Sequence, residues 1–220
     1  MTETSTARGT AAGQGFPDAI GFGFAELALL LSLRRGPEAE ASAKALRLVE
    51  ELDDASMLAA GASSLVARGA ATAEPGGELS VAGPVAAVTS ALTEAVKHVQ
   101  INLLTVDSVD NVLSVESPKY QILLQPRAYL SWFAMAQRPD ATPAEANFYI
   151  IRKHLEDHPS GGATIRLLQD DAKTQLLVKR SGPGWAVGYG ATDAPSAPIQ
   201  EITGLTDGQV MDHIRSIRQD

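Results

Sequence analysis

The sequence predicts an α+β protein, in which a helical, winged-helix-like N-terminal region is followed by an antiparallel sheet covered by helices. Up to residue 96, apolar residues recur three and four positions apart, which is typical of amphipathic helices. After residue 97, short runs alternate between apolar and polar residues, are rich in β-branched residues, and are separated by turn residues. We therefore divide the chain into a disordered tail (1–16), a helical region (17–96) and a sheet with two helices (97–220).

The helical region opens with three expected helices, at 24–34, 38–52 and 54–68. Gly36-Pro37 stops the first helix, and Asp53 or Asp54 can cap the third, with Gly69 just beyond its end. A short hairpin is expected next, with strands at 70–73 and 78–81 around a turn containing Pro75. Gly83-Pro84 then begins a fourth helix.

This order of elements resembles a winged helix, which raises the question of DNA binding. A DNA-reading helix and wing need basic side chains to meet phosphates and guanines. Residues 53–83 hold one basic residue, Arg68, against four acidic ones, and residues 1–95 hold six Lys or Arg against twelve Asp or Glu. The net charge of −8 for the whole chain argues against nucleic acid as the main partner. A winged-helix transcription regulator with a sensing or dimerisation domain stays open as the alternative.

The second region begins with a meander of four expected strands, at 99–106, 111–115, 120–124 and 129–136. Thr142, Pro143 and Glu145 form the pattern of a capping box with proline at the first helical position, so a helix should follow. Three more strands are expected at 164–169, 174–180 and 185–189, then a loop at 191–200. Thr206 or Asp207 should cap a last helix that runs through Ile217.

The sequence carries no catalytic pattern, so we expect neither an enzyme nor a cofactor. There is no cysteine and no G-x-S-x-G motif. His154 and His158 stand one helical turn apart, which suits a metal ion, but no third ligand is evident, and we expect no metal site. No apolar run reaches the roughly 18 residues that suggest a membrane span, and the start lacks a secretory signal. We therefore expect no membrane partner and a cytoplasmic location.

Several segments carry a family resemblance. In the first half, the relevant segments are, in order, GFAELALLLSLRR, SLVARGAA with its L-x-x-R-G step, GELSVAGPVAAVTSAL and VKHVQINLLTV. In the second half they are KRSGPGWAVGYG and LTDGQVMDHIRSI. This order resembles the EspG family, the cytosolic chaperones of actinobacterial type VII secretion, over residues 22–105 and 164–217. The resemblance implies no catalysis, no cofactor, and a helical secreted substrate bound on sheet and loop surfaces.

The resulting expectation is a non-enzymatic chaperone or adaptor that binds a helical protein partner, and a homo-oligomer is left open. Binding energy would come from aromatic and aliphatic anchors on a sheet face and its loops. Tyr129, Trp132 and Trp185 are the candidate partner-binding residues.

Overall fold

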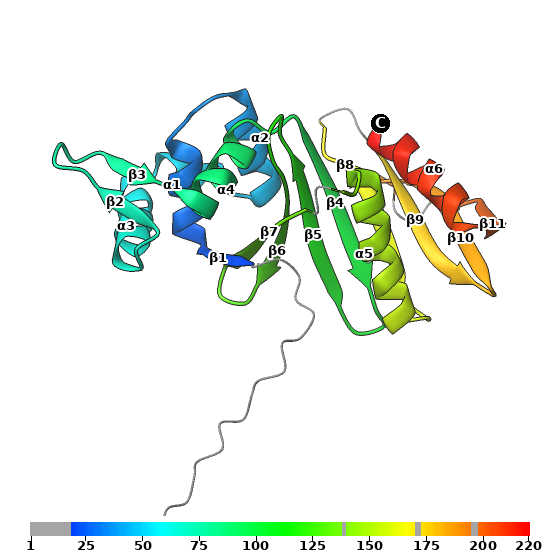
Figure 1. Ribbon diagram of the computed structural model, residues 1–220. Helices are drawn as coiled ribbons and strands as arrows, with labels where there is room; N and C mark the ends of the chain where they lie inside the picture. Colours follow the sequence, from blue (N-terminus) through cyan, green and yellow to red (C-terminus); the bar gives the residue numbers. More distant parts are fainter. Residues whose placement is uncertain (1–18, 138–139, 170–172, 195–197) are drawn as a thin grey trace, which may run out of the picture.

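The computed structural model describes residues 19–137, 140–169, 173–194 and 198–220, and the expected disordered tail (1–16) lies outside this part of the chain. The α+β class is confirmed: helices surround one large antiparallel sheet (Figure 1). The sheet has nine strands in the order β1-β7-β6-β5-β4-β8-β9-β10-β11. Their bounds are β1 Ile20–Gly23, β4 Lys97–Leu104, β5 Val109–Glu116, β6 Gln121–Arg127, β7 Ser131–Ala136, β8 Gly162–Leu167, β9 Thr174–Ser181, β10 Gly184–Ala191 and β11 Glu201–Leu205.

The helices begin largely where the sequence places their caps. They are α1 Phe24–Ser32, α2 Pro37–Leu46, α3 Ala55–Ala67, α4 Gly83–Thr93, α5 Pro143–Asp157 and α6 Asp207–Arg218. The Asp54 carboxylate accepts hydrogen bonds from the backbone N–H of Ser56 and Met57 at the start of α3. Thr142 with Glu145, and Thr206 with Gln209, form capping boxes at α5 and α6, so both expected helix starts are confirmed.

The second helix ends six residues earlier than the sequence predicts. Arg47 adopts a left-handed conformation (φ 60°, ψ 46°), and the Leu48 N–H donates back to the Ala43 carbonyl at 2.8 Å. This reversal brings the Leu48 side chain into the core, where it is fully buried. A 3₁₀ helix at Glu50–Asp53 then replaces the expected last turn. The sequence showed a helical pattern of apolar residues as far as Leu52 because Leu48 and Leu52 are both buried. The left-handed turn buries Leu48, and the 3₁₀ helix buries Leu52.

The short hairpin expected after α3 is present as β2 (Ala71–Ala73) paired with β3 (Leu79–Val81). The order of helices and hairpin therefore matches the expectation, but a winged-helix arrangement is not confirmed. The helical region also contributes a strand that the sequence analysis missed. β1 precedes α1 and pairs with β7, from Ile20↔Ala134 to Gly23↔Ser131, so this region forms one edge of the sheet.

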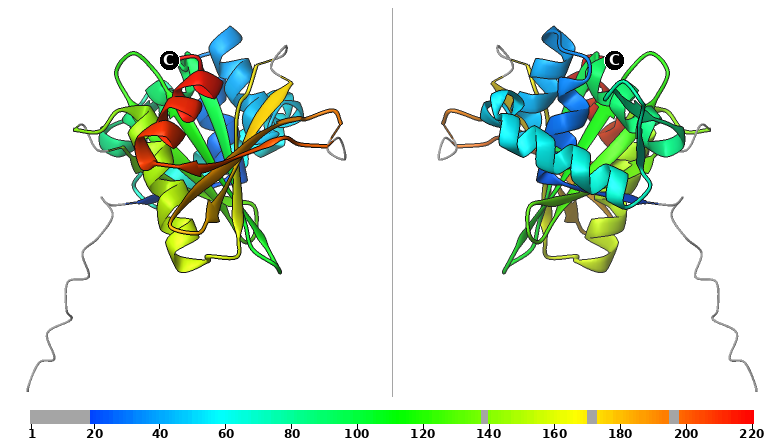
Figure 2. Two further views of the ribbon diagram at one scale, coloured as in Figure 1. Left: turned by 90° about the vertical axis from the view of Figure 1, so that its right-hand side faces the viewer. Right: turned by 90° about the vertical axis from the view of Figure 1, so that its left-hand side faces the viewer.

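Helices cover opposite faces of the sheet in its two halves. α1 to α4 pack with β1, β5, β6 and β7 in a first core, whereas α5 and α6 pack with β4, β8, β9 and β10 in a second. Neighbouring residues of β5 show the change of face: Val112 belongs to the second core and Leu113 to the first, and successive side chains of a strand point to opposite faces. Figure 2 shows α5 and α6 lying together on one side of the strands they cover.

Candidate functional site

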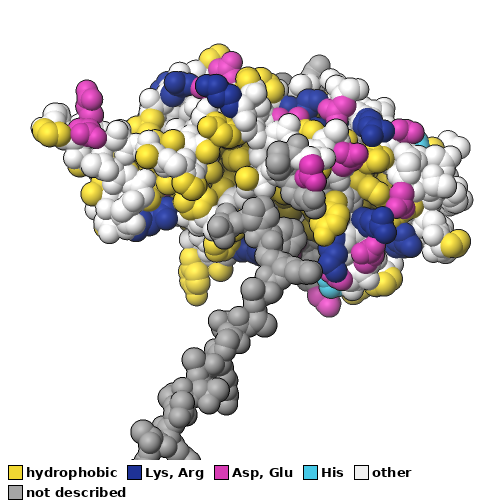
Figure 3. Space-filling view, viewed as in Figure 1, with side chains coloured by type: hydrophobic (Ala, Val, Ile, Leu, Met, Phe, Trp, Pro, Cys, Tyr) yellow, Lys and Arg dark blue, Asp and Glu magenta, His cyan; other side chains and the backbone are white. Residues whose placement is uncertain are grey.

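One end of the sheet carries exposed apolar side chains on two hairpin turns. The hairpin of β4 and β5 exposes Val106 in its turn (86%) and Val109 at the start of β5 (64%), and the loop between β6 and β7 exposes Tyr129 (99%) and Leu130 (67%). Because all four strands are antiparallel, both turns lie at the same end of the sheet (Figure 1). We call these four residues the hairpin-end surface. In the space-filling view, the β6–β7 loop projects from the body as a group of hydrophobic side chains (Figure 3).

The β6–β7 loop holds its two apolar residues in an unusual backbone conformation. Arg127 pairs with Ser131 at the ends of the strands, and the Ser131 hydroxyl donates to the Ala128 carbonyl at 2.8 Å. Between them, Tyr129 (φ 59°) and Leu130 (φ 53°) are both left-handed, which costs free energy for residues other than glycine. The loop therefore directs two large apolar side chains into solvent in a defined backbone geometry.

Phe133, at the base of this loop, continues the apolar surface along the strand. It lies on the face of β7 opposite Trp132, and the Arg127 guanidinium stacks over its ring at 5.6 Å. Gly21 of β1 is its cross-strand neighbour, and a Cβ at that position would lie 3.3 Å from the ring. The absence of a side chain at Gly21 thus leaves room for the ring against the edge strand. Phe133 is partly exposed and extends the apolar surface beyond the four residues of the hairpin-end surface.

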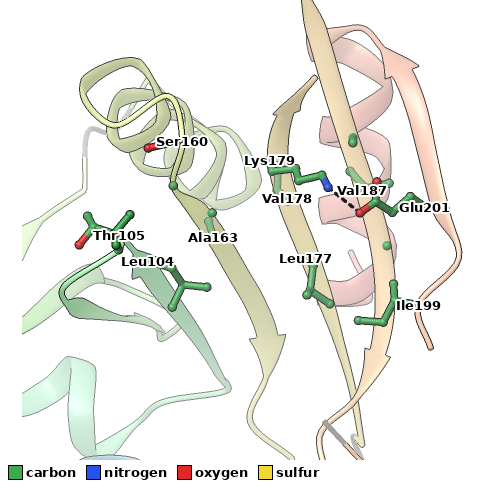
Figure 4. A pocket seen from close by; sticks show the side chains of 15 residues that line it. Leu104, Thr105, Ser160, Ala163, Leu177, Val178, Lys179, Val187, Ile199 and Glu201 are labelled. Carbon is green, nitrogen blue, oxygen red and sulfur yellow. Dashed lines mark hydrogen bonds and ion pairs between the residues drawn. The ribbon is translucent and has the colours of Figure 1, made fainter. Parts of the chain in front are cut away.

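An apolar cleft of ≈ 410 Å³ opens beside the β4–β5 turn. Figure 4 shows Leu104 and Thr105 on one wall, with Leu177, Ile199 and the Lys179–Glu201 ion pair on the other. The Lys179 Nζ and Glu201 Oε1 atoms lie 2.6 Å apart. The segment before β8 can approach the end of β4 closely because Gly161 has no side chain. A Cβ at Gly161 would lie 2.5 Å from the Leu104 carbonyl oxygen. The cleft offers an apolar hollow next to Val106, which also lines it.

The three predicted binding residues lie in different environments. Tyr129 is at the tip of the β6–β7 loop and fully exposed, as a binding anchor requires. Trp132 is half-buried and packs against the first core. Trp185 is 1% exposed in the second core, so it has no surface to offer to a partner, and we withdraw it from the candidate site. Its indole N–H donates to Asp207 at 2.7 Å, and its ring packs edge-on against Phe148 at 5.6 Å.

Leu130 and Val106 were missed because their strands were expected to be longer, whereas Val109 was expected in the turn between the strands 99–106 and 111–115 and lies at the start of β5. The sequence analysis assigned 129–136 and 99–106 to strands, whereas β7 begins at Ser131 and β4 ends at Leu104. A strand residue has an even chance of facing the core, but a residue in a hairpin turn of three or four residues is held in solvent. The signal that could have found Leu130 is the apolar pair Tyr129-Leu130 in a segment short enough to be a hairpin loop.

The described histidines are engaged in structural contacts. The Ser42 hydroxyl donates to the Leu92 carbonyl at 2.5 Å, so the buried His98 ring donates through Nε2 to the Ser42 oxygen at 2.8 Å. With its proton already engaged, Ser42 is not set up as a nucleophile. His154 Nε2 contacts the Leu104 carbonyl at 3.0 Å. In the described segments, no group of three or more His, Asp or Glu residues is arranged to hold a metal ion.

Arg68, the one basic residue of the α3 and β2–β3 segment, is partly exposed but bonded to other residues of the protein. Its guanidinium donates to the buried Glu26 carboxylate at 2.9 Å and to the Gly21 carbonyl at 3.0 Å. Glu26 also accepts from the Gly23 N–H and the Ser64 hydroxyl, so it links α1 to α3. Engaged in this network, Arg68 is poorly placed to meet a DNA phosphate.

Comparisons with known proteins give no family. No protein-family model matches the chain, and no curated protein matches it. Among the described residues, no helix combines the length and apolarity that crossing a membrane requires.

Proposed function

We propose that this protein is a non-enzymatic chaperone or adaptor that binds a protein partner through the hairpin-end surface. The observation that carries the proposal is the β6–β7 loop, where Tyr129 and Leu130 are exposed side by side on a left-handed backbone. Large apolar side chains that stand together in solvent commonly mark interaction sites, and tyrosine is among the residues that dominate binding energy at interfaces. The apolar surface at this end of the molecule is larger still, because it includes Val106, Val109 and the adjacent cleft.

A helical partner segment suits this surface. The pairing of β5 with β6 runs from Glu116↔Gln121 only to Leu113↔Leu124, so the two hairpins diverge towards their turns. An amphipathic helix could place its apolar stripe across the two turns, with anchors at helical spacing. The most specific form of the proposal follows from the sequence resemblance: an EspG-like cytosolic chaperone that holds a secreted helical protein before export.

A winged-helix regulator is less well supported. The α3 and β2–β3 segment has one basic residue, and that residue is engaged by Glu26. The four acidic residues of 53–83 would repel the phosphate backbone. We therefore propose protein binding and do not propose DNA binding.

The test is affinity purification from the native host with quantitative mass spectrometry, using the wild type and the double variant Tyr129→Ala/Leu130→Ser. If the two side chains anchor the partner, their removal should cost about 2 kcal/mol or more, about thirtyfold in affinity. One helical protein, recovered in equal amount with the wild type, should be lost with the variant. Binding of the purified pair, measured by calorimetry, gives the size of the loss.

Tyr149→Ala is the matched control, because Tyr149 is also largely exposed but belongs to α5 and not to either hairpin. It should keep the partner. Equal recovery of the partner with wild type and double variant would reject the hairpin-end surface as the binding site. Recovery of the chain alone would favour a homo-oligomer.

A further inference from the structure

A second cleft, of ≈ 650 Å³, lies at the opposite end of the sheet from the hairpin-end surface, between α2 and the strands β4 and β8. α2 contributes Lys44, the turn after it contributes Arg47, the start of β4 contributes His98 and Gln100, and β8 contributes Arg166. The face of the sheet exposed here is the one that α5 and α6 leave uncovered, because Gln100 and Arg166 pair across the strands on the side opposite Ile101 and Ile165. Helix and sheet therefore form two walls of an open cleft.

The cleft is rich in positive charge on a protein that is acidic overall. Its lining includes the basic residues Lys44, Arg47 and Arg166, with Glu40 as the acidic lining residue, whereas the whole chain has a net charge of −8. Lys97 also borders the cleft, but its side chain lies on the opposite face of β4, with Val99 and Ile101, where its Nζ lies 2.7 Å from the Asp220 carboxylate. Clefts lined by one sign of charge concentrate the field and attract the opposite charge.

Arg166 gives the cleft its recognition geometry. Its Nε and Nη2 atoms both donate to the amide oxygen of Gln100, at 2.9 and 2.5 Å. Gln100 is neutral, so these bonds orient the guanidinium without compensating its charge. Arginine presents its donors in a planar fork that fits carboxylate and phosphate oxygens. Arg47, the left-handed residue that follows α2, is a second arginine that lines the cleft, on the wall that α2 forms.

We propose that this cleft binds a small oxyanion with two or more negative charges, a polycarboxylate or a phosphate compound, between Arg166 and Arg47. The volume lies within the range of small-molecule sites. Because Arg47 and Arg166 line different walls of the cleft, they suit a ligand that carries negative charge at both ends. The site is independent of the hairpin-end surface, because the two lie at opposite ends of the strands.

The test is isothermal titration calorimetry of the full chain with citrate and, separately, with pyrophosphate, which distinguishes a carboxylate from a phosphate ligand. We expect saturable binding by at least one of them, weakening as salt is added. Arg166→Gln and Arg47→Gln should each weaken binding about tenfold, which corresponds to about 1.4 kcal/mol. Arg47 is exposed, so its variant keeps the test valid if Arg166→Gln does not fold.

Arg215→Gln is the control, because it removes the same charge from α6, where Arg215 pairs with Asp212. It should change the affinity less than about twofold. The proposal fails if neither anion binds at about 10 mM, a concentration well above a millimolar dissociation constant. It also fails if Arg215→Gln weakens binding as much as the two cleft variants do, since binding would then follow net charge alone.

Discussion

Individual buried polar residues hold the helices of this protein in place. Glu26 joins α1 to α3 through Arg68 and Ser64. Arg218, fully buried at the end of α6, pairs with Glu116 of β5 at 2.7 Å and also bonds Asn147 of α5. Since an unpaired buried polar group is costly, each of these networks fixes one arrangement of its elements.

The buried His98 makes stability depend on pH. Burial lowers the pKa of His98 to about 4, from an ordinary value of 6.5. Below pH 6.5 the unfolded chain takes up a proton on this residue that the folded chain excludes until about pH 4. Stability should therefore fall as the pH drops through this window, by up to about 3 kcal/mol from this group.

Urea unfolding of wild type and His98→Asn at pH 7 and pH 4.5 measures this contribution. The variant should lose less stability between the two pH values, because the titrating group is gone while carboxylates are unchanged. An equal loss in both proteins would show that His98 is not the cause.

At the scale of elements, caps and turns decide where helices and hairpins end. The capping residues Asp54, Thr142 and Thr206 start their helices as the sequence predicts, because a side-chain oxygen that satisfies free N–H groups is a local effect. The end of α2 at Arg47 could not be predicted in this way. No glycine or proline marks it, and the left-handed turn is stabilised by burying Leu48 in the core.

Replacing Arg47 with glycine should relieve the left-handed backbone and stabilise the protein by about 1 kcal/mol. Urea denaturation measures the change in the free energy of unfolding. Lys44→Gly, inside the same helix, should instead destabilise by about 1 kcal/mol, because glycine weakens a helix interior. If both variants destabilise alike, Arg47 is not under backbone strain.

At the scale of the whole molecule, one continuous sheet connects two cores on opposite faces. β4 and β5 pair along eight residue positions, and β5 contributes side chains to both cores. The sequence analysis divided the chain between residues 96 and 97. In the structure the two parts share one sheet, because β1 of the helical region pairs with β7. This continuity favours cooperative unfolding over two independent units.

The two tryptophans provide a test, since Trp132 packs against the first core and Trp185 lies in the second. Fluorescence of Trp132→Phe reports on the second core, and that of Trp185→Phe reports on the first. Each variant should give one urea transition that coincides with its own far-ultraviolet circular dichroism. A fluorescence midpoint that departs from circular dichroism in either variant would show that the two cores unfold separately.

The sequence by itself determined the α+β class, most strand positions and the main helix starts, because periodicity and capping depend on residues a few positions apart. It also determined the shortage of basic residues in the segment 53–83. Only the tertiary structure decided that Trp185 is buried while Tyr129 and Leu130 are exposed, and that Arg47 and Arg166 face one cleft. Burial and the meeting of distant side chains depend on which face of the sheet each helix covers, and no local pattern in the sequence encodes that choice.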